Sequence, residues 1–172
     1  MMLAIVFLPI GSGTSFGAVA PSEDALKAAF IFNFAQFTRW PPETGASLPI
    51  RFCLYGTSLA PDGAASLSGK MVGGRPTEVG TFLSVELPDG CSVLFIGAEY
   101  GAERICELVG NAAADILTVS DMQGFAECGG HITLTTINNR LRFVVNLEAV
   151  DQSNLALSAQ LLELAIISSA AR

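Results

Sequence analysis

The clearest structural signal in this chain is the stretch LTVSDMQGFAECGGHITLTTINNRLRFVVN, residues 117–146. It begins with a short apolar run that ends on Ser120-Asp121, as is typical of a buried strand. After Gly129-Gly130, residues alternate between polar and apolar, and Asn138-Asn139 offers a two-residue turn that tolerates positive φ. We therefore predict a strand, a glycine-bearing loop and a tight β-hairpin.

Patterns upstream of this stretch alternate between strand and helix. Strands are expected at residues 50–56, 77–82 and 91–97. The last of these is apolar almost throughout, which is typical of a strand buried on both faces of a parallel sheet. Helices are expected at residues 23–40, 64–67, 102–109 and 155–168. This order predicts an α/β fold: a layered sheet, mostly parallel with an antiparallel C-terminal hairpin, flanked by helices.

The first expected helix is apolar around most of its girth. Its apolar stripe consists of Leu26, Phe30, Phe34 and Phe37. Ile31, Phe32 and Ala35 are apolar on its other sides. Such a helix is buried either within its own domain or against a second copy of the chain. In the second case, an apolar surface that includes Phe32 is a candidate contact for a partner.

The N-terminal segment has the features of a secretory signal peptide. Residues 1–20 carry no charged side chain, and an apolar run leads to Ala18-Val19-Ala20, which is an A-x-A cleavage signature. The run is too short to cross a bilayer, which takes roughly 20 residues. We therefore expect residues 1–20 to be removed on export and residues 21–172 to form a single domain.

Composition excludes some classes of partner. The chain has 172 residues, a net charge of −7 and only nine Lys and Arg residues. Nucleic acids and anionic membrane surfaces are bound by clustered cations, so neither is expected as the main partner. A mean hydropathy of +0.50 with 15% charged residues predicts a rather apolar surface, which favours a protein partner or self-association.

Four cysteines in an exported chain favour disulfides. Their spacing matches no metal-binding motif and His131 is the only histidine, so no metal site is expected. Cys53 and Cys91 lie in neighbouring expected strands, and we predict that they form a disulfide. Cys106 lies in an expected helix and Cys128 in the glycine-bearing loop, so these two either form a second bridge or remain free thiols.

No spacing in the sequence requires an enzyme. The expected domain, residues 21–172, contains no G-x-S-x-G motif, and His131 has no fixed carboxylate near it in sequence, so we interpret it as a hydrogen-bonded or solvent-facing strand residue. Asp121 follows a strand end, where open α/β sheets bind ligands, although an Asp there more often caps a turn. Arg75 and Arg142 could each bind an anion or pair with a carboxylate. We expect a non-enzymatic protein with no catalytic residues and no cofactor.

The order of these motifs resembles the YfiR-like family of periplasmic regulators. The motifs are KAAFxxNFAxFxxWP at residues 27–41, a strand ending in glycine at 50–56, GKxVxGRP at 69–76, CxxLFIG at 91–97, LTVSDxxGF at 117–125, GGxI at 129–132 and RxRFxxN at 140–146. The resemblance covers nearly the whole expected domain, about residues 22–167.

This resemblance implies a periplasmic, non-enzymatic protein that binds the sensor region of an inner-membrane diguanylate cyclase, or another sensor protein, and inhibits it. Cyclic-di-GMP and biofilm would be controlled in this way. The resemblance also implies an outer-membrane lipoprotein that sequesters the regulator, a homodimer, and a structural disulfide at Cys53 and Cys91. The alternative function is a periplasmic small-ligand receptor with a pocket near Arg75, Asp121 and Arg142.

Overall fold

A computed structural model describes the chain at residues 21–42, 48–56, 59, 61–83, 86–87 and 89–168. The expected signal peptide, residues 1–20, lies outside the described residues. Within the described part, no helix is long and apolar enough to cross a membrane.

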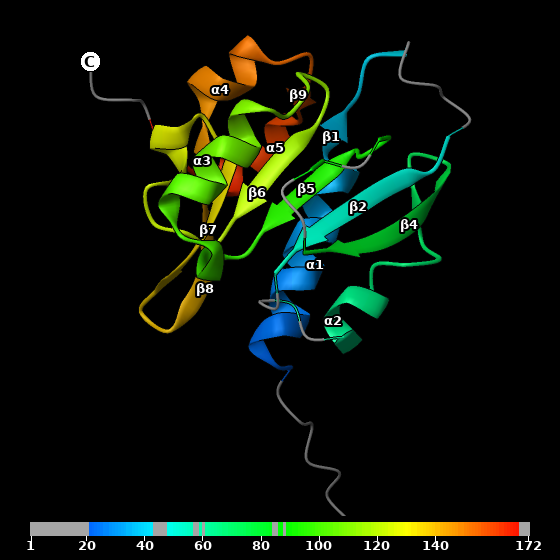
Figure 1. Ribbon diagram of the computed structural model, residues 1–172, viewed down its shortest axis with the longest axis horizontal. Coiled ribbons are helices and arrows are strands. Elements are labelled where there is room, and N and C mark those ends of the chain that lie inside the picture. The colour runs from blue at the N-terminus through cyan, green and yellow to red at the C-terminus, as the bar shows by residue number, and fades with distance from the viewer. Residues whose placement is uncertain are drawn as a thin grey trace, which may run out of the picture.

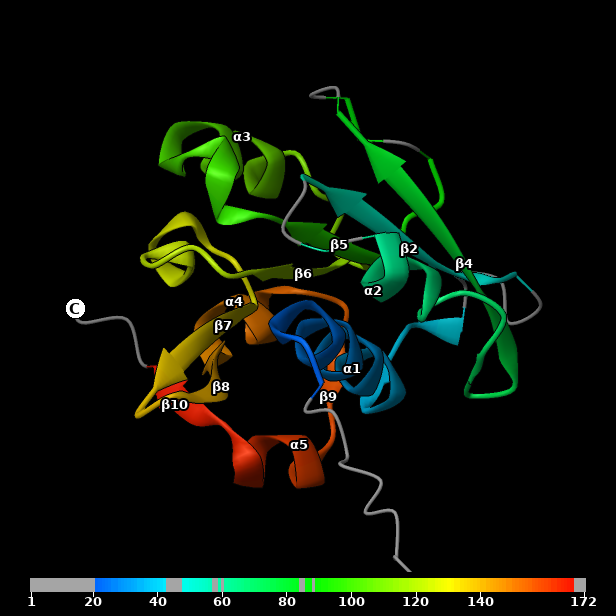
Figure 2. The same ribbon diagram turned by 90° about the horizontal axis from the view of Figure 1, so that it is seen from below.

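Eight strands form one mixed sheet in the order β10-β8-β7-β6-β5-β2-β4-β3 (Figures 1 and 2). Their bounds are β2 (Ile50–Tyr55), β3 (Met71–Val72), β4 (Arg75–Phe82), β5 (Val93–Ile96), β6 (Leu117–Ser120), β7 (Ile132–Ile137), β8 (Arg140–Asn146) and β10 (Ile166–Ser168). Strands β4, β2, β5, β6 and β7 run parallel, and β8 returns antiparallel to β7. The predicted fold class is therefore confirmed.

The helices are α1 (Glu23–Gln36), α2 (Pro61–Ala65), α3 (Ala102–Gly110), α4 (Leu147–Gln152) and α5 (Ala159–Leu164). Short 3-10 turns follow β5 and β6, at η2 (Ala98–Tyr100) and η3 (Phe125–Cys128). A separate antiparallel pair joins β1 (Thr38–Arg39) to β9 (Ala156–Leu157), and so ties the end of α1 to the C-terminal segment.

Both faces of the central sheet are covered, which explains its nearly continuous apolar strands. Phe52 and Leu54 of β2 belong to the core cluster that α1 covers, whereas Cys53 and Tyr55 belong to the cluster under α3. Figure 2 shows α1 and α3 on opposite sides of the sheet.

Most of the apolar side chains of α1 pack within the domain, although Leu26 is 38% exposed. The sheet covers one side of this helix, where the rings of Phe34 and Phe143 lie 4.9 Å apart. On another side, α1 shares its core cluster with Leu155 and Leu161 of the C-terminal segment, and Figure 2 shows α1 between the sheet and α5. The structure thus supplies a partner for the helix inside one chain.

Three helix predictions were wrong in extent. The short helix expected at residues 64–67 is α2, Pro61–Ala65. The first helix ends at Gln36 rather than at residue 40, because the Thr38 hydroxyl donates to the carbonyl of Phe34 at 2.7 Å and the chain then pairs with β9. The expected helix 155–168 consists of β9, α5 and β10. Ser158 caps α5, and Ala165 is extended with ψ 150°, so the helical spacing of the leucines does not produce a single helix.

The hairpin forms as predicted. Asn138 and Asn139 both have positive φ, 50° and 58°, which fits the two-residue turn expected between β7 and β8. Two disulfides lie on the α3 side of the sheet. Cys53 bonds Cys91, and Cys106 of α3 bonds Cys128 of η3, so neither of the last two is a free thiol.

Candidate functional site

Asp121 ties two distant elements together at the carboxyl end of β6. One carboxylate oxygen accepts a hydrogen bond from the backbone N–H of Ala98 at 2.7 Å, just beyond β5. The other lies 2.8 Å from Nζ of Lys27 on α1. The Lys27 and Asp121 side chains are only 12% and 14% exposed. Asp121 thus joins α1 to the sheet and caps η2, so its carboxylate already has two structural partners.

Lys27 is held in its charged form by this arrangement. Burial lowers the pKa of Lys27, but the hydrogen bonds and negative charges of Asp121 and Glu23 outweigh burial and raise the pKa above its ordinary value of 10.5. Glu23 lies 3.2 Å from the ammonium and is 69% exposed, so Asp121 is the buried partner. The cluster is an ion-pair network that positions α1.

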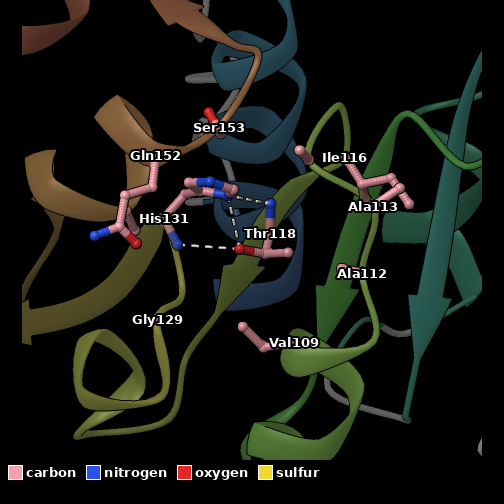
Figure 3. A pocket seen from close by; sticks show the side chains of 11 residues that line it. Val109, Ala112, Ala113, Ile116, Thr118, Gly129, His131, Gln152 and Ser153 are labelled. Atoms are coloured by element: carbon pink, nitrogen blue, oxygen red, sulfur yellow. Dashed lines mark hydrogen bonds between the residues drawn. The ribbon is translucent and has the colours of Figure 1, made fainter.

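His131 lies at the start of β7 with a fixed tautomer (Figure 3). The backbone N–H of Thr118 donates to its Nδ1 at 3.1 Å, and the Thr118 hydroxyl lies 2.8 Å from the same atom. In return, the backbone N–H of His131 donates to the Thr118 hydroxyl oxygen at 3.0 Å. Because Nδ1 accepts, the ring proton of the neutral imidazole is on Nε2.

Burial opposes protonation of this ring. His131 is 7% exposed, and desolvation lowers its pKa from 6.5 to about 4, although the backbone of Ala149 acts in the opposite direction. A proton on Nδ1 would also replace the hydrogen bond from Thr118 by repulsion between two donors. His131 is therefore a neutral structural residue at neutral pH, which agrees with the hydrogen-bonded interpretation made from sequence.

A cavity of about 220 Å³ lies beside His131, between α3, β6 and α4. Figure 3 shows Thr118, Gln152 and Ser153 around it, with the imidazole facing Thr118. The Ser153 hydroxyl donates to the carbonyl of Val150 at 2.7 Å and accepts from the N–H of Leu155 at 3.1 Å. The Ser153 hydroxyl is therefore engaged with the backbone. The Thr118 hydroxyl lies beside the imidazole, but Thr118 is only 1% exposed and its oxygen already accepts a hydrogen bond from the His131 N–H, so this pair is a buried structural contact.

The three residues expected to line a ligand pocket are not brought together. Arg75 begins β4, whereas Asp121 follows the carboxyl end of β6, which lies at the opposite end of a parallel sheet. Arg142 is exposed on β8 opposite Thr135. Phe32 is half-buried against the core, with Nζ of Lys70 4.5 Å from its ring centroid. Arg75 therefore does not share a pocket with Asp121, which lines a cavity of about 240 Å³ together with Thr135.

A different cavity contains Arg75. It measures about 340 Å³ and is lined by Gln36, Thr38, Arg39, Trp40, Pro41, Pro42, Ile50, Val72, Gly73 and Arg75. Trp40 Nε1 is the one buried side-chain nitrogen or oxygen in the described part of the chain that has no hydrogen-bond partner. A buried donor without an acceptor costs about 1–3 kcal/mol and is unusual. Sequence reasoning missed this residue, although a single Trp before two prolines was visible.

Apolar side chains are exposed at one edge of the sheet, on the outermost strand β10 and at the last residue of α5, Leu164. Leu164, Ile166 and Ile167 are 70%, 43% and 45% exposed, and we call these three residues the C-terminal apolar edge. β10 pairs with β8 on its inner side, and no described strand pairs with its outer side. The leucine spacing in this segment predicted a helix, which concealed the edge from sequence reasoning.

The described residues contain no group of three or more His, Cys, Asp or Glu side chains that could hold a metal ion. A comparison with curated proteins finds no matching relative. A family model described as YfiR/HmsC-like matches residues 24–166, from the first turn of α1 to the first residue of β10. Because that match spans most of the chain and agrees with the motif order, this protein belongs to the YfiR/HmsC-like family.

Proposed function

We propose that this protein binds the periplasmic sensor region of an inner-membrane diguanylate cyclase and holds the enzyme inactive, which lowers cyclic-di-GMP and biofilm formation. The YfiR/HmsC-like family consists of non-catalytic periplasmic regulators of cyclic-di-GMP signalling, and membership supports the regulatory part of the proposal. Two disulfides also suit an exported protein, because oxidising compartments retain them.

The observation that carries the binding part is the C-terminal apolar edge. Natural edge strands are usually protected by charges, prolines or a covering segment. Residues 164–168 read LAIIS and include no charge and no proline, and their three large side chains are exposed. Such an edge favours an added strand or an apolar helix from a partner. We assign the cyclase contact to this edge.

Two further partners follow from family membership. We propose that an outer-membrane lipoprotein relieves the inhibition by sequestering the regulator, and that the regulator acts as a homodimer. Both proposals rest on the family alone.

The test is complementation of a deletion strain. Deleting the gene should raise cyclic-di-GMP and surface attachment, and the wild-type gene should restore both. The double variant Ile166→Lys/Ile167→Lys should fail to restore them, because a partner would have to bury two ammonium groups. Met71→Lys is the matched control, since Met71 is 54% exposed on β3 at the opposite edge of the sheet.

Immunoblots and thermal melts must show that both variants accumulate and fold. If the deletion leaves cyclic-di-GMP unchanged in a host that expresses the protein, the regulatory proposal is wrong. If the double variant complements as well as Met71→Lys, the edge is not the contact.

A further inference from the structure

The cavity around Trp40 has a size and a lining suited to a small molecule. Its volume of about 340 Å³ falls within the range of ligand pockets, roughly 300–1,000 Å³. Trp40, Pro41, Ile50 and Val72 give it an apolar wall. It lies beside β3, whereas the C-terminal apolar edge belongs to β10 at the other end of the strand order, so the two features can be tested separately.

The charge of this cavity is opposite to that of the protein. The chain has a net charge of −7, yet the charged side chains among the described lining residues are Arg39 and Arg75. Arg75 is anchored, since its Nε donates to the carbonyl of Leu48 at 2.6 Å and one terminal nitrogen to that of Pro49 at 3.4 Å. Arg39 is exposed and forms no salt bridge with a described residue. Guanidinium groups match carboxylates in geometry as well as in charge.

Trp40 gives a second, independent indication of a ligand. Its indole N–H is buried and has no acceptor among the described residues. Native proteins satisfy nearly all buried donors, so an orphaned one needs an explanation. Since Trp40 forms part of the cavity wall, an acceptor atom bound in the cavity would provide the missing partner.

We propose that this cavity binds a small carboxylate with an apolar body. The carboxylate pairs with Arg39 and Arg75, and the apolar body packs against Trp40 and the neighbouring wall. One carboxylate oxygen accepts a hydrogen bond from the Trp40 N–H, after a small rotation of the indole toward the ligand. Of the three residues expected near a ligand pocket, this site contains Arg75 but neither Asp121 nor Arg142, and it does not depend on the proposed cyclase contact.

Trp40 makes the test direct, because it is the one tryptophan in the chain. The full exported domain is titrated with benzoate and with cyclohexanecarboxylate while Trp40 fluorescence and the single indole N–H signal in a proton–nitrogen NMR spectrum are followed. Both acids should give saturable changes, and the indole proton should move downfield as it gains an acceptor. Benzylamine has the same ring as benzoate with the opposite charge and should give no saturable change. Inorganic phosphate, which has no apolar body, should bind more weakly than benzoate.

Arg39→Gln should weaken benzoate binding about tenfold or more, since one charge-assisted pair is lost. Arg142→Gln is the matched control, because Arg142 is also exposed but lies outside the cavity. This variant should bind benzoate with the affinity of the wild type. The proposal is overturned if neither acid saturates up to millimolar concentrations, if benzylamine binds as well as benzoate, or if Arg39→Gln and Arg142→Gln bind alike. Loss of the cyclase interaction would leave these readouts unchanged.

Discussion

Removing the Asp121 carboxylate should loosen α1 from the sheet. In Asp121→Ala, the Lys27 ammonium loses a partner at 2.8 Å and the Ala98 N–H loses an acceptor at 2.7 Å. Hydrogen bonds to charged groups contribute about 1.5–3 kcal/mol each, and both ion-pair side chains are largely buried. Because Glu23 and solvent still reach Lys27, we expect the free energy of unfolding to fall by about 3–4 kcal/mol.

Urea unfolding of matched variants separates the two contacts. Asp121→Asn keeps an oxygen for the Ala98 N–H and should cost only about 2 kcal/mol. Glu23→Gln is the control, since this exposed partner of Lys27 should contribute about 0.5 kcal/mol or less. A double-mutant cycle of Asp121→Asn with Lys27→Met should give a coupling energy of about 1–3 kcal/mol. The reasoning is refuted if Asp121→Ala costs no more than Glu23→Gln.

Four further predictions concern pH, the two disulfides and the hairpin turn. The pKa of His131 is about 4 in the folded protein and 6.5 in the unfolded chain, so its neutral form adds about 3 kcal/mol of stability above pH 6.5 that is lost as the pH falls toward 4. Urea titrations should therefore show a different dependence of the unfolding free energy on pH for wild type and His131→Gln in that interval. Equal pH slopes would contradict the assignment. Replacing Cys53 and Cys91 by Ala opens a loop of 38 residues and should cost about 4 kcal/mol by calorimetry. Mass mapping under graded reductant should find Cys106–Cys128 reduced first, because these cysteines are half-buried and Cys53 is fully buried. Asn139→Gly should increase the free energy of unfolding by about 0.5–1 kcal/mol and so raise the melting temperature, because glycine adopts the φ of 58° found there more readily than asparagine. A lower melting temperature would argue against the turn.

The elements predictable from sequence are those whose signal is local. Alternation across residues 131–137 and the Asn138-Asn139 turn specify the hairpin without help from the rest of the chain, and the apolar run at 91–97 identifies a strand with two covered faces. The features that sequence reasoning missed depend on distant partners. The end of α1 is fixed where Arg39 pairs with Ala156, which no local pattern encodes.

The site shows the same division. Asp121 was visible as a polar residue at a strand end, but its roles require Lys27, 94 residues away in sequence, and the N–H of Ala98. Helical spacing of leucines concealed β10, because the chain leaves the helix at the extended Ala165 and then pairs with β8, which lies far away in sequence. That Trp40 lacks an acceptor is a property of the folded surroundings and has no counterpart in sequence.

Site-specific photo-crosslinking in the periplasm tests the central proposal most directly. A photoreactive amino acid is placed at Ile167 on the C-terminal apolar edge, or at Met71 on the opposite sheet edge, and adducts are identified by mass spectrometry. We predict an adduct between the Ile167 variant and the periplasmic region of an inner-membrane diguanylate cyclase, and none from the Met71 variant. Equal adducts from both positions, or no cyclase adduct from Ile167 in cells whose cyclic-di-GMP responds to the protein, would contradict the proposal.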